Sequence, residues 1–453
     1  VREHQAALQA IADANGGVRA AGTPGYDQSV QYIVDKMTAA GYNVTLNAFP
    51  FTYVALPVLR QIALIAATYE SGTFTGTGYG DVTRNVTAVD INLVMPRAST
   101  SGCEAADFAG FPAGNIALVQ RGTCTFALKA ENAQAAGASA VIIFNQGNTP
   151  DREPLIIGTL APFVATIPVI GASFADGEAL AQPGAVAQVQ VAAPQQLTQY
   201  NVIAESRDGD PNNVVMAGAH LDSVLRGPGI NDNGSGSAAI LETAIQMAKV
   251  KPRNKLRFAW WGAEESGLVG SNAYVAGLSA EEKAKIALYL NFDMVGSPNH
   301  VFFIYDGDDS DATGAGPGPA GSAEIEKVFE DFFTARGVPF KGSDFTGRSD
   351  YGAFIANGIP AGGLFTGAEG IKTAAEAAIW GGTAGQQYDP CSHLRCDTYA
   401  NNNDTALDVN SDAVAYSVLQ FAMNTEVVNG QRGKGNFKMP PEEEDDHHGN
   451  ATR

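Results

Sequence analysis

Residues 213–249 read NVVMAGAHLDSVLRGPGINDNGSGSAAILETAIQMAK, and the prediction of the fold starts from these residues. It opens with an apolar, β-branched segment that predicts a buried strand, and it shows helical periodicity from about Ser235 to Met247. The loop between them holds His220, Asp222 and Asp232 among several glycines. Ligands bind at the carboxyl ends of strands in open α/β sheets, so these side chains lie where a metal site is expected. On this stretch alone, the alternative is a hydrogen-bonded histidine and two turn-forming aspartates.

Strand-like and helical segments alternate after Pro194. Strands are predicted near Asn201–Ala204, Val214–Gly218, Lys255–Trp261, Ile286–Asp293, Val301–Tyr305 and Ala361–Leu364, and helices near Ser235–Lys249, Ser322–Arg336 and Thr405–Asn424. Such alternation predicts an α/β fold in which helices cover both faces of a mostly parallel sheet. Residues 1–50 are predicted to be helical and then extended. They have no core of their own, so we expect them to pack onto this later part.

The segment from about Ala55 to Leu197 has a different character and contains no histidine. Short β-rich runs at Asn85–Val94, Ile116–Gln120 and Ala140–Phe144 are separated by Gly/Pro turns, with one helix at Phe126–Ala136. We therefore predict an α/β domain formed by residues 1–54 and 198–437. A β-rich domain at 55–197 is inserted into it, and the acidic tail at 438–453 is predicted to be disordered.

The formal net charge of -20 is the main compositional constraint. No basic patch is available to neutralise phosphates, which argues against nucleic acids and anionic membrane surfaces as partners. No run of about eighteen apolar residues is present, so no membrane-spanning segment is predicted. A negative surface favours cationic ligands, including peptides with a free amino terminus.

Four cysteines fall into two local pairs, Cys103 with Cys124 and Cys391 with Cys396, each suited to a disulfide. No CxxC spacing indicates a thiolate zinc site. Asn-x-Ser/Thr acceptors for glycosylation occur at Asn43, Asn85, Asn403 and Asn450, and a fifth at Asn233 is interpreted as a chance match inside the loop described above. These features favour an oxidising, extracellular setting. The start at Val1 without a signal peptide fits a secreted protein in processed form.

Acidic residues also follow two further predicted strands. Glu264 and Glu265 come shortly after Lys255–Trp261, and Asp293 ends the next strand. Carboxylates in such places are costly to bury unless they are paired or bind a metal. The carboxylates at 264 and 265 could instead lie at an exposed helix N-terminus, but that does not account for all three strand ends. Of the six histidines, only His220 and His393 lie beside both turn residues and carboxylates.

Several motifs in this order resemble one enzyme family. They are His220-Leu221-Asp222-Ser223, Gly229 to Gly236, Trp261 to Ser271, Asn291-Phe292-Asp293-Met294, Gly347 to Tyr351, and Asp389-Pro390-Cys391 with His393. The chain is similar to the co-catalytic zinc aminopeptidases of the aminopeptidase Y and bacterial leucyl aminopeptidase group, closely over residues 200–425 and loosely over the first fifty. Residues 114–126, 137–145 and 167–170 resemble the protease-associated domain, an accessory module without catalytic residues.

This resemblance implies two zinc ions bridged by Asp232. His220 and Asp293 would hold one ion, and Glu265 and His393 the other. Imidazole and carboxylate ligands suit zinc, and each ion keeps a position for water. Two ions about 3.5–4 Å apart can share one hydroxide and stabilise a tetrahedral intermediate. In the family, the peptide bond after Asp232 is cis.

The resemblance also assigns roles to other residues. Glu264 would be the general base, and Asp222 would hydrogen-bond His220 and hold its tautomer. Glu264, Asp293 and the position of Arg348 would recognise the amino terminus of the substrate. The alternative for Arg348 is a structural salt bridge with Asp350.

The chain departs from many relatives at Ser392. Those relatives have a tyrosine there, directly before the histidine ligand, and its hydroxyl helps to stabilise the oxyanion. In this chain the hydroxyl of Ser392, that of Tyr388, or the zinc ions alone would have to do so.

The sequence therefore predicts a secreted, monomeric zinc aminopeptidase that removes leucine or another bulky apolar residue from the amino terminus of peptides. The alternative enzyme on the same scaffold is a metallocarboxypeptidase or glutamate carboxypeptidase. A catalytically inactive peptidase that binds partners through its insert is a further alternative. The intact ligand set and Glu264 argue against the inactive protein.

Overall fold

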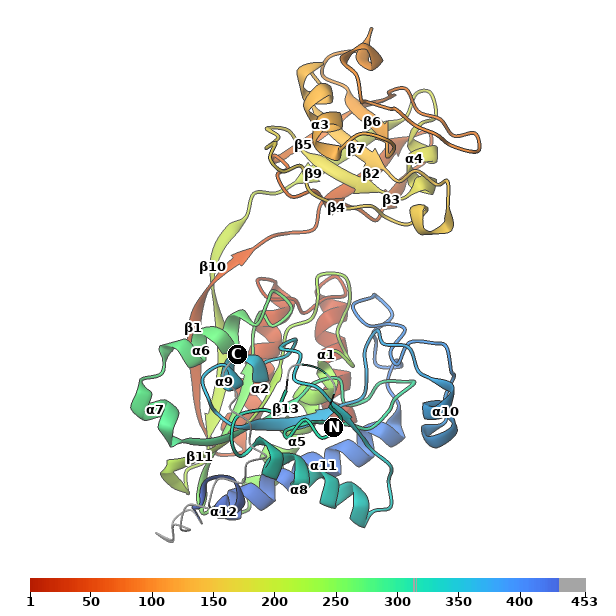
Figure 1. Cartoon of the computed structure of the whole chain (residues 1–453). Coiled ribbons are helices and arrows are strands. Elements are labelled where there is room, and N and C mark those ends of the chain that lie inside the picture. Colours follow the sequence, from red (N-terminus) through yellow and green to blue (C-terminus); the bar gives the residue numbers. More distant parts are fainter. Residues whose placement is uncertain (313, 315, 432–453) are drawn as a thin grey trace. The chain divides into compact units, whose positions relative to one another are not determined.

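The computed structural model describes residues 1–312, 314 and 316–431, and the chain divides into two compact units (Figure 1). The α/β unit contains Val1–Phe51 and the chain from Gln196 onward, and the insert unit is Thr52–Gln195. The sequence-based boundaries were placed after residues 54 and 197. The predicted disordered tail at 438–453 lies outside the described residues. None of the described helices combines the length and apolar character needed to cross a bilayer.

The α/β unit is built on an eight-stranded sheet of order β1-β10-β12-β11-β13-β16-β14-β15. Its strands are β1 (Asn43–Tyr53), β10 (Gln195–Glu205), β11 (Asp210–His220), β12 (Asn254–Trp261), β13 (Ile286–Phe292), β14 (Phe303–Tyr305), β15 (Lys341–Ser343) and β16 (Ala361–Phe365). The four central strands pair in parallel, whereas β10 and β14 run antiparallel to their neighbours β12 and β16. The predicted mostly parallel sheet is therefore confirmed.

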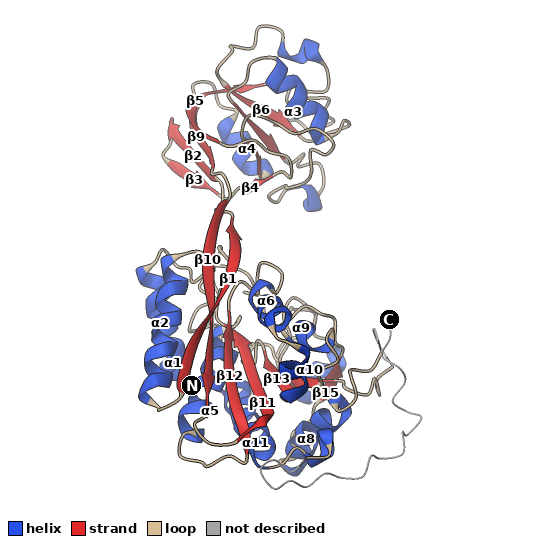
Figure 2. Cartoon of the chain, turned by 90° about the vertical axis from the view of Figure 1, so that its left-hand side faces the viewer, coloured by secondary structure: helices blue, strands red, loops and turns tan. Residues whose placement is uncertain are grey.

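Helices cover both faces of this sheet because its central strands are apolar on both sides. Val215 and Ala217 of β11 join one hydrophobic cluster, and Val214 and Met216 join a second on the opposite face. Figure 2 shows the central strands between helices α1 and α2 on one side and α6 and α9 on the other. The helices are α1 (Arg2–Ala14), α2 (Pro24–Ala39), α5 (Gly234–Met247), α6 (Val269–Gly277), α7 (Ala280–Lys285), α8 (Ser322–Ala335), α9 (Tyr351–Ile355), α10 (Ala374–Trp380), α11 (Asp404–Met423) and α12 (Glu426–Asn429).

Helix α5 begins directly after the loop that carries Asp232. Its N-cap is Asn233, whose side chain accepts a hydrogen bond of 2.9 Å from the backbone N–H of Gly236. A Cβ atom on Gly236 would lie 2.1 Å from the carbonyl oxygen of Phe292, so only glycine permits this approach of the helix to β13. The start of α5 is thereby fixed against the strand that precedes Asp293.

The insert unit has its own eight-stranded sheet, of order β3-β2-β9-β5-β6-β7-β8-β4, in which β5 to β8 run parallel. Its elements are β2 (Val58–Ala63), β3 (Ala67–Tyr69), β4 (Gly72–Thr73), β5 (Gly80–Ala88), β6 (Ile116–Gln120), β7 (Ala140–Phe144), β8 (Val169–Ala172), β9 (Val186–Val191), α3 (Phe126–Ala135) and α4 (Phe174–Leu180), with 3-10 turns at Ala105–Phe108 and Pro150–Arg152. The strand predicted at Asn85–Val94 was placed too late. Asp90 has a φ of 44°, which ends extended pairing before the predicted strand does.

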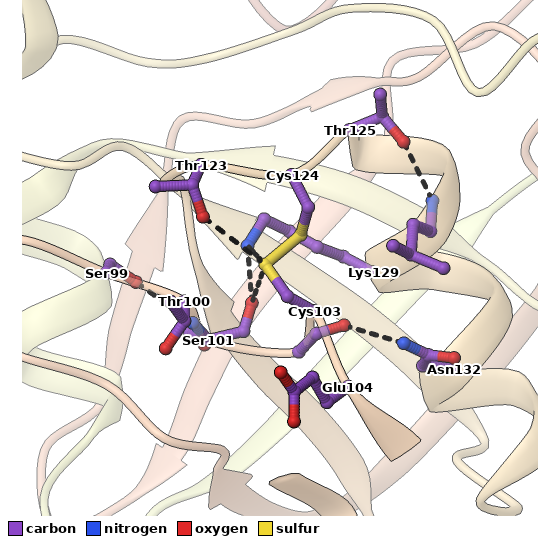
Figure 3. The surroundings of a disulfide bond; sticks show 12 residues. Ser99, Thr100, Ser101, Cys103, Glu104, Thr123, Cys124, Thr125, Lys129 and Asn132 are labelled. Carbon is purple, nitrogen blue, oxygen red and sulfur yellow. Dashed lines mark hydrogen bonds between the residues drawn. A yellow bond between two sulfur atoms is a disulfide. The ribbon is translucent and has the colours of Figure 1, made fainter. Parts of the chain in front are cut away.

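A disulfide joins Cys103 to Cys124 in the insert unit (Figure 3). Beside it, Lys129 of α3 is fully buried, and its ammonium group donates a hydrogen bond to the carbonyl oxygen of Ser101. The same group lies 3.6 Å from the sulfur of Cys103. Burial lowers the pKa of Lys129 to about 8. This part of the insert unit is held by a covalent bond and by a buried cation.

Candidate metal centre

Three neighbouring strands carry the predicted site residues at their carboxyl ends. β11 ends at His220, and β12 and β13 flank it in parallel, so all three strands end at one edge of the sheet. Glu264 follows the end of β12, and Asp293 follows the end of β13. The buried strands thus deliver an imidazole and carboxylates to one place, as expected for a ligand site in an α/β sheet.

The five predicted metal ligands lie together in the structure. Nε2 of His220 is 3.2 Å from Oδ1 of Asp232 and 3.4 Å from Oδ1 of Asp293. Nε2 of His393 is 3.1 Å from Oδ2 of Asp232 and 3.2 Å from Oε2 of Glu265. Asp232 therefore directs one carboxylate oxygen toward each histidine. This arrangement makes two adjacent groups of donors that share one carboxylate.

The donors suit a pair of divalent cations. Two carboxylate oxygens in this cluster, Oε1 of Glu265 and Oδ1 of Asp293, are buried and have no hydrogen-bond partner. Buried carboxylates of this kind are stable only when paired with protons, cations or hydrogen-bond donors. Imidazole nitrogen and carboxylate oxygen are donors that zinc accepts. The residues present therefore fit the metal that the sequence implied.

Charges inside the site perturb one another strongly. Burial raises the pKa of Glu264 well above its usual value, and burial together with repulsion from Asp232 raises that of Glu265 to about 7. Hydrogen bonds to Asp232 and Glu265 raise the pKa of His393 to about 11. For His220, burial lowers the pKa, but the charges of Glu264 and other carboxylates outweigh it and raise the pKa. Bound cations would supply the positive charge that protonated imidazoles otherwise provide.

Asp222 links the two glutamates to the strand that carries His220. Its carboxylate accepts hydrogen bonds from the backbone N–H of Glu264 at 3.1 Å and of Glu265 at 3.3 Å. Nδ1 of His220 lies 3.1 Å from the backbone carbonyl of Asp222 and 3.7 Å from its carboxylate. The carboxylate of Asp222 thus holds the backbone of Glu264 and Glu265. The closest partner of Nδ1 of His220 is the backbone carbonyl oxygen of Asp222.

A chain of hydrogen bonds holds Asp293. Nε1 of Trp261 donates to the hydroxyl of Tyr289 at 2.8 Å, and that hydroxyl donates to Oδ1 of Asn291 at 3.0 Å. Nδ2 of Asn291 donates to Ser349 at 2.9 Å, and Ser349 donates to Oδ2 of Asp293 at 2.6 Å. Indole is a donor only, so it sets the direction of every bond in the chain. Oδ2 of Asp293 is thereby occupied, and Oδ1 remains for a metal ion.

The loop that carries His393 is closed by the disulfide between Cys391 and Cys396. His393 has a φ of 60°, a conformation rare for a residue with a side chain. Asp389 accepts hydrogen bonds from the backbone N–H of Cys391 at 2.8 Å and from Nδ2 of Asn231 at 2.7 Å. Although the His393 side chain is 53% exposed, its backbone is therefore tied to the loop that carries Asp232.

A cavity of about 490 Å³ opens beside the cluster. The metal-site side chains and Ser392 line one part of it. The rest of the lining is mixed: it includes apolar side chains, among them Leu268, Met294, Phe303 and Phe365, and polar ones such as Asp344 and Thr346. A cavity that combines carboxylates with apolar side chains suits a ligand that has both a charged group and a hydrophobic group.

Two side chains singled out in the sequence have partners outside the cluster. Arg348 is 68% exposed and donates to Glu369 at 2.5 Å, so its salt-bridge partner is Glu369 and not Asp350, the partner considered as an alternative. The ring of Tyr388 lines the cavity, but its hydroxyl donates to Glu376 at 2.8 Å. Of the two side-chain hydroxyls considered for the oxyanion, the one at 388 is therefore already engaged.

Sequence reasoning missed two buried ionisable residues that hold the loop before Asp232. Arg19 and Asp397 are both buried, and both hydrogen-bond the backbone of this loop. The only signal in the sequence is a charged residue in an otherwise small and apolar turn, Val18-Arg19-Ala20-Ala21.

Known proteins resemble the chain in both units. Residues 201–418 match peptidase family M28, and residues 89–180 match the PA domain. An aminopeptidase of Pseudomonas aeruginosa strain PAO1 is 54% identical over 434 residues, which cover 94% of this chain and 81% of the relative. The probable leucine aminopeptidase 2 of Aspergillus fumigatus is 45% identical over 361 residues, covering 77% and 70%.

The fold of the chain is also similar to that of solved aminopeptidase structures. An aminopeptidase from Aneurinibacillus sp. strain AM-1 is 30% identical, with a TM-score of 0.56 and 93% of both chains covered. The fold also matches that of a zinc aminopeptidase from Bacillus subtilis, with a TM-score of 0.63 and coverage of 92% and 94% at 24% identity. The chain therefore belongs to peptidase family M28 and is a metallo-aminopeptidase that carries a PA domain.

Proposed function

We propose that the chain is a secreted di-zinc aminopeptidase that releases leucine and similar bulky apolar residues from peptide amino termini. The peptidase domain would be residues 1–54 and 198–437, with the PA insert at 55–197. The observation that carries the proposal is the pair of imidazoles that share Asp232, at 3.2 Å from His220 and 3.1 Å from His393. Asp293 would complete one ion's protein ligands and Glu265 the other's.

Two bound zinc ions would polarise the scissile carbonyl and lower the pKa of a water molecule. Glu264 would accept the proton of that water on its carboxylate and later pass it to the leaving amine. Residue 264 is buried, and this burial raises the pKa of its carboxyl group, so it holds a proton more tightly than an exposed glutamate does. Asp222 supports this role because it holds the backbone N–H of Glu264.

Recognition of the substrate amino terminus would fall to Glu264, Asp293 and the backbone at Arg348. The two carboxylates line the cavity and can receive an ammonium group. The side chain of Arg348 is engaged with Glu369, so the backbone of this residue is the part left for the substrate. For the oxyanion, Ser392 and the zinc ions remain as candidates.

The walls of the cavity support a preference for apolar residues. Leu268, Met294, Phe303 and Phe365 offer a substrate side chain apolar contact in the cavity that Asp293 also lines. Fully burying a leucine side chain is worth about 1.5–3 kcal/mol. We therefore expect kcat/KM for leucyl substrates to exceed that for glycyl substrates by about 10- to 100-fold.

An extracellular location is supported by both disulfides, since none of the four cysteines is free. Among the proposed glycosylation sites, Asn43 and Asn85 are exposed, and Asn450 lies outside the described residues. The side chain of Asn403 caps α11 by accepting a hydrogen bond of 3.0 Å from Ala406.

Hydrolysis of leucyl-p-nitroanilide tests the proposal directly. We expect a zinc content of two ions per chain, loss of activity after chelation and recovery on addition of zinc. The matched substrate N-acetyl-leucyl-p-nitroanilide, which lacks the free amine, should not be cleaved. Cleavage of the blocked substrate, or of a carboxyl-terminal residue from a hippuryl peptide, would contradict an aminopeptidase.

A further inference from the structure

The loop from Leu221 to Asp232, here called the site loop, is buried although it has no regular secondary structure. Most of its residues, including Asp222 and Asp232, have little or no exposed surface. Backbone N–H and C=O groups that are buried outside helices and sheets still need hydrogen-bond partners. Loops usually solve this by running over the surface, where water is the partner. The site loop therefore needs partners from within the protein.

Arg19 supplies donors for the carbonyl groups of the site loop. Its guanidinium donates to the carbonyl oxygens of Leu221 at 2.5 Å, Pro228 at 2.9 Å and Gly229 at 2.6 Å. Its own backbone N–H donates to the hydroxyl of Ser223 at 2.9 Å. Arg19 has no exposed surface, and burial lowers its pKa only to about 10, so it remains charged at neutral pH. One side chain thus connects the start of the loop to residues 228 and 229.

Asp397 supplies acceptors for the N–H groups of the same loop. Its carboxylate accepts from the backbone N–H of Asn231 at 2.9 Å and of Asp232 at 3.0 Å. Its backbone carbonyl accepts from the N–H of Ile230 at 3.1 Å. Asp397 follows the disulfide loop that carries His393. It therefore connects the backbone of the shared carboxylate to the loop of the second histidine.

We propose that Arg19 and Asp397 are positioning residues that hold the site loop in its metal-binding conformation before metal enters. Arg19 engages the carbonyl groups of residues 221, 228 and 229, and Asp397 engages the N–H groups of residues 231 and 232. Neither side chain offers an atom to the metal cluster. The inference rests on the proposed function, because it takes His220 and Asp232 as metal ligands.

Zinc affinity measured against a chromophoric chelator tests the proposal in the full-length chain. In Arg19→Lys the positive charge remains, but one ammonium group cannot reach three carbonyl oxygens arranged for a planar guanidinium. We expect its zinc dissociation constants to rise by about 10- to 100-fold, as for other groups that orient metal ligands. The visible spectrum of the cobalt-substituted protein should change too, because the ligand geometry loosens.

Arg257→Lys is the matched control. Arg257 is also mostly buried and donates to Glu205 at 2.8 Å and Tyr274 at 2.8 Å, but it lies within β12 and touches no part of the site loop. We expect it to lower the melting temperature while zinc affinity and the cobalt spectrum stay unchanged. Equal loss of zinc affinity in both lysine variants would overturn the proposal, and so would wild-type affinity in Arg19→Lys.

Asp397→Asn provides a second measurement should Arg19→Lys fail to fold. An asparagine side chain has one acceptor oxygen in place of two, so one of the N–H groups at 231 and 232 loses its partner. We expect weaker zinc binding of the same order, and unchanged binding would refute the positioning role. The proposed function fails separately, if the wild-type chain binds two zinc ions and does not hydrolyse leucyl-p-nitroanilide.

Discussion

The two units of this protein carry sheets of similar plan but different chemistry. Each sheet has eight strands and a parallel centre, and in each the parallel strands end at a common edge. In the α/β unit β11 ends at a histidine, and β12 and β13 are followed by glutamate and aspartate. In the insert unit, β6 ends at Gln120, β7 is followed by Asn145 and β8 by Ser173. Among the described residues, every group of side chains able to hold a metal lies in the α/β unit.

The polar residues at the sheet edge of the insert unit stabilise its own backbone. Nε2 of Gln120 donates to the carbonyl groups of Asn92 at 2.9 Å and Gln146 at 3.1 Å. Nδ2 of Asn145 donates to the carbonyl of Pro154 at 2.9 Å. Neutral amides can be buried in this way without a counter-charge. The comparison teaches that the edge of a parallel sheet offers a place for a site, and charged side chains decide whether one forms.

Glu264→Gln should give the largest effect of any single change proposed in this article. The amide keeps the volume of the side chain but cannot accept the proton of water, so we expect kcat to fall by about 10²–10⁴. Steady-state hydrolysis of leucyl-p-nitroanilide and metal analysis of the same sample measure this. Zinc content should stay at the wild-type level.

The matched change at the other sheet edge is Gln120→Ala. It removes the hydrogen bonds to Asn92 and Gln146, so it should lower the stability of the insert unit without altering kcat. An active Glu264→Gln would remove the assigned base. Equal loss of kcat in both variants would mean that the two edges do not differ in function.

Removal of the two disulfides should affect the two units differently. Cys391→Ser with Cys396→Ser loosens the loop of His393, and we expect weaker zinc binding and at least about a 10-fold loss of activity. Cys103→Ser with Cys124→Ser opens a loop of sequence separation 21, and we expect a loss of about 3 kcal/mol in the free energy of unfolding with no change in kcat. Denaturant titration and kinetics of both double variants give the two quantities. A reversed pattern would contradict this division of roles.

Much of this contrast could be predicted from the sequence, because it depends on local patterns. The apolar segment before His220 predicts β11, and the residues after β12 and β13 predict the acids at the same edge. Partners that approach from distant parts of the chain could not be predicted. Arg19 meets its carbonyl groups across about two hundred residues, and neither it nor Asp397 belongs to a periodic pattern.

The strand of the insert unit predicted at Asn85–Val94 illustrates a different limit. Its β-rich composition continues past the point where the structure ends β5 at Ala88. Asp90 adopts a positive φ there, and composition does not reveal a single backbone angle. The alternative salt bridge between Arg348 and Asp350 does not form, because the exposed guanidinium pairs with Glu369 while Asp350 is buried.

Stability against pH should distinguish the buried basic groups of the two units. The pKa of Lys129 is lowered by burial to about 8 from 10.5, so the unfolded chain binds the proton more tightly. Stability of the insert unit should therefore rise as pH increases from about 8 to 10.5, by up to about 3 kcal/mol. Lys129→Met should abolish this rise. Denaturant titrations of both proteins between pH 7 and about 11 measure it.

His300 of the α/β unit should give a slope of the same sign, but in the acidic pH range. Burial lowers its pKa to about 4 from 6.5, so the unfolded chain takes up a proton that the folded chain resists. Stability of this unit should fall as pH decreases from 6.5 to about 4, and His300→Gln should reduce the fall. An alkaline rise that persists in Lys129→Met would show that the buried lysine is not its source.

Arg348→Ala should have the smallest effect, although this residue lies on the cavity next to the site. Its side chain is 68% exposed, and its ion pair with Glu369 is of the kind that contributes about 0–1 kcal/mol. The backbone that is proposed to receive the substrate amine is unchanged by the substitution. We therefore expect KM for leucyl-p-nitroanilide to change by no more than about fivefold and kcat to stay the same.

Glu369→Ala is the control, since it frees the guanidinium without removing it. A hundredfold rise in KM in Arg348→Ala alone would make the guanidinium itself a substrate contact. In that case, exposed charge would contribute to recognition as much as the buried acids at the end of the sheet.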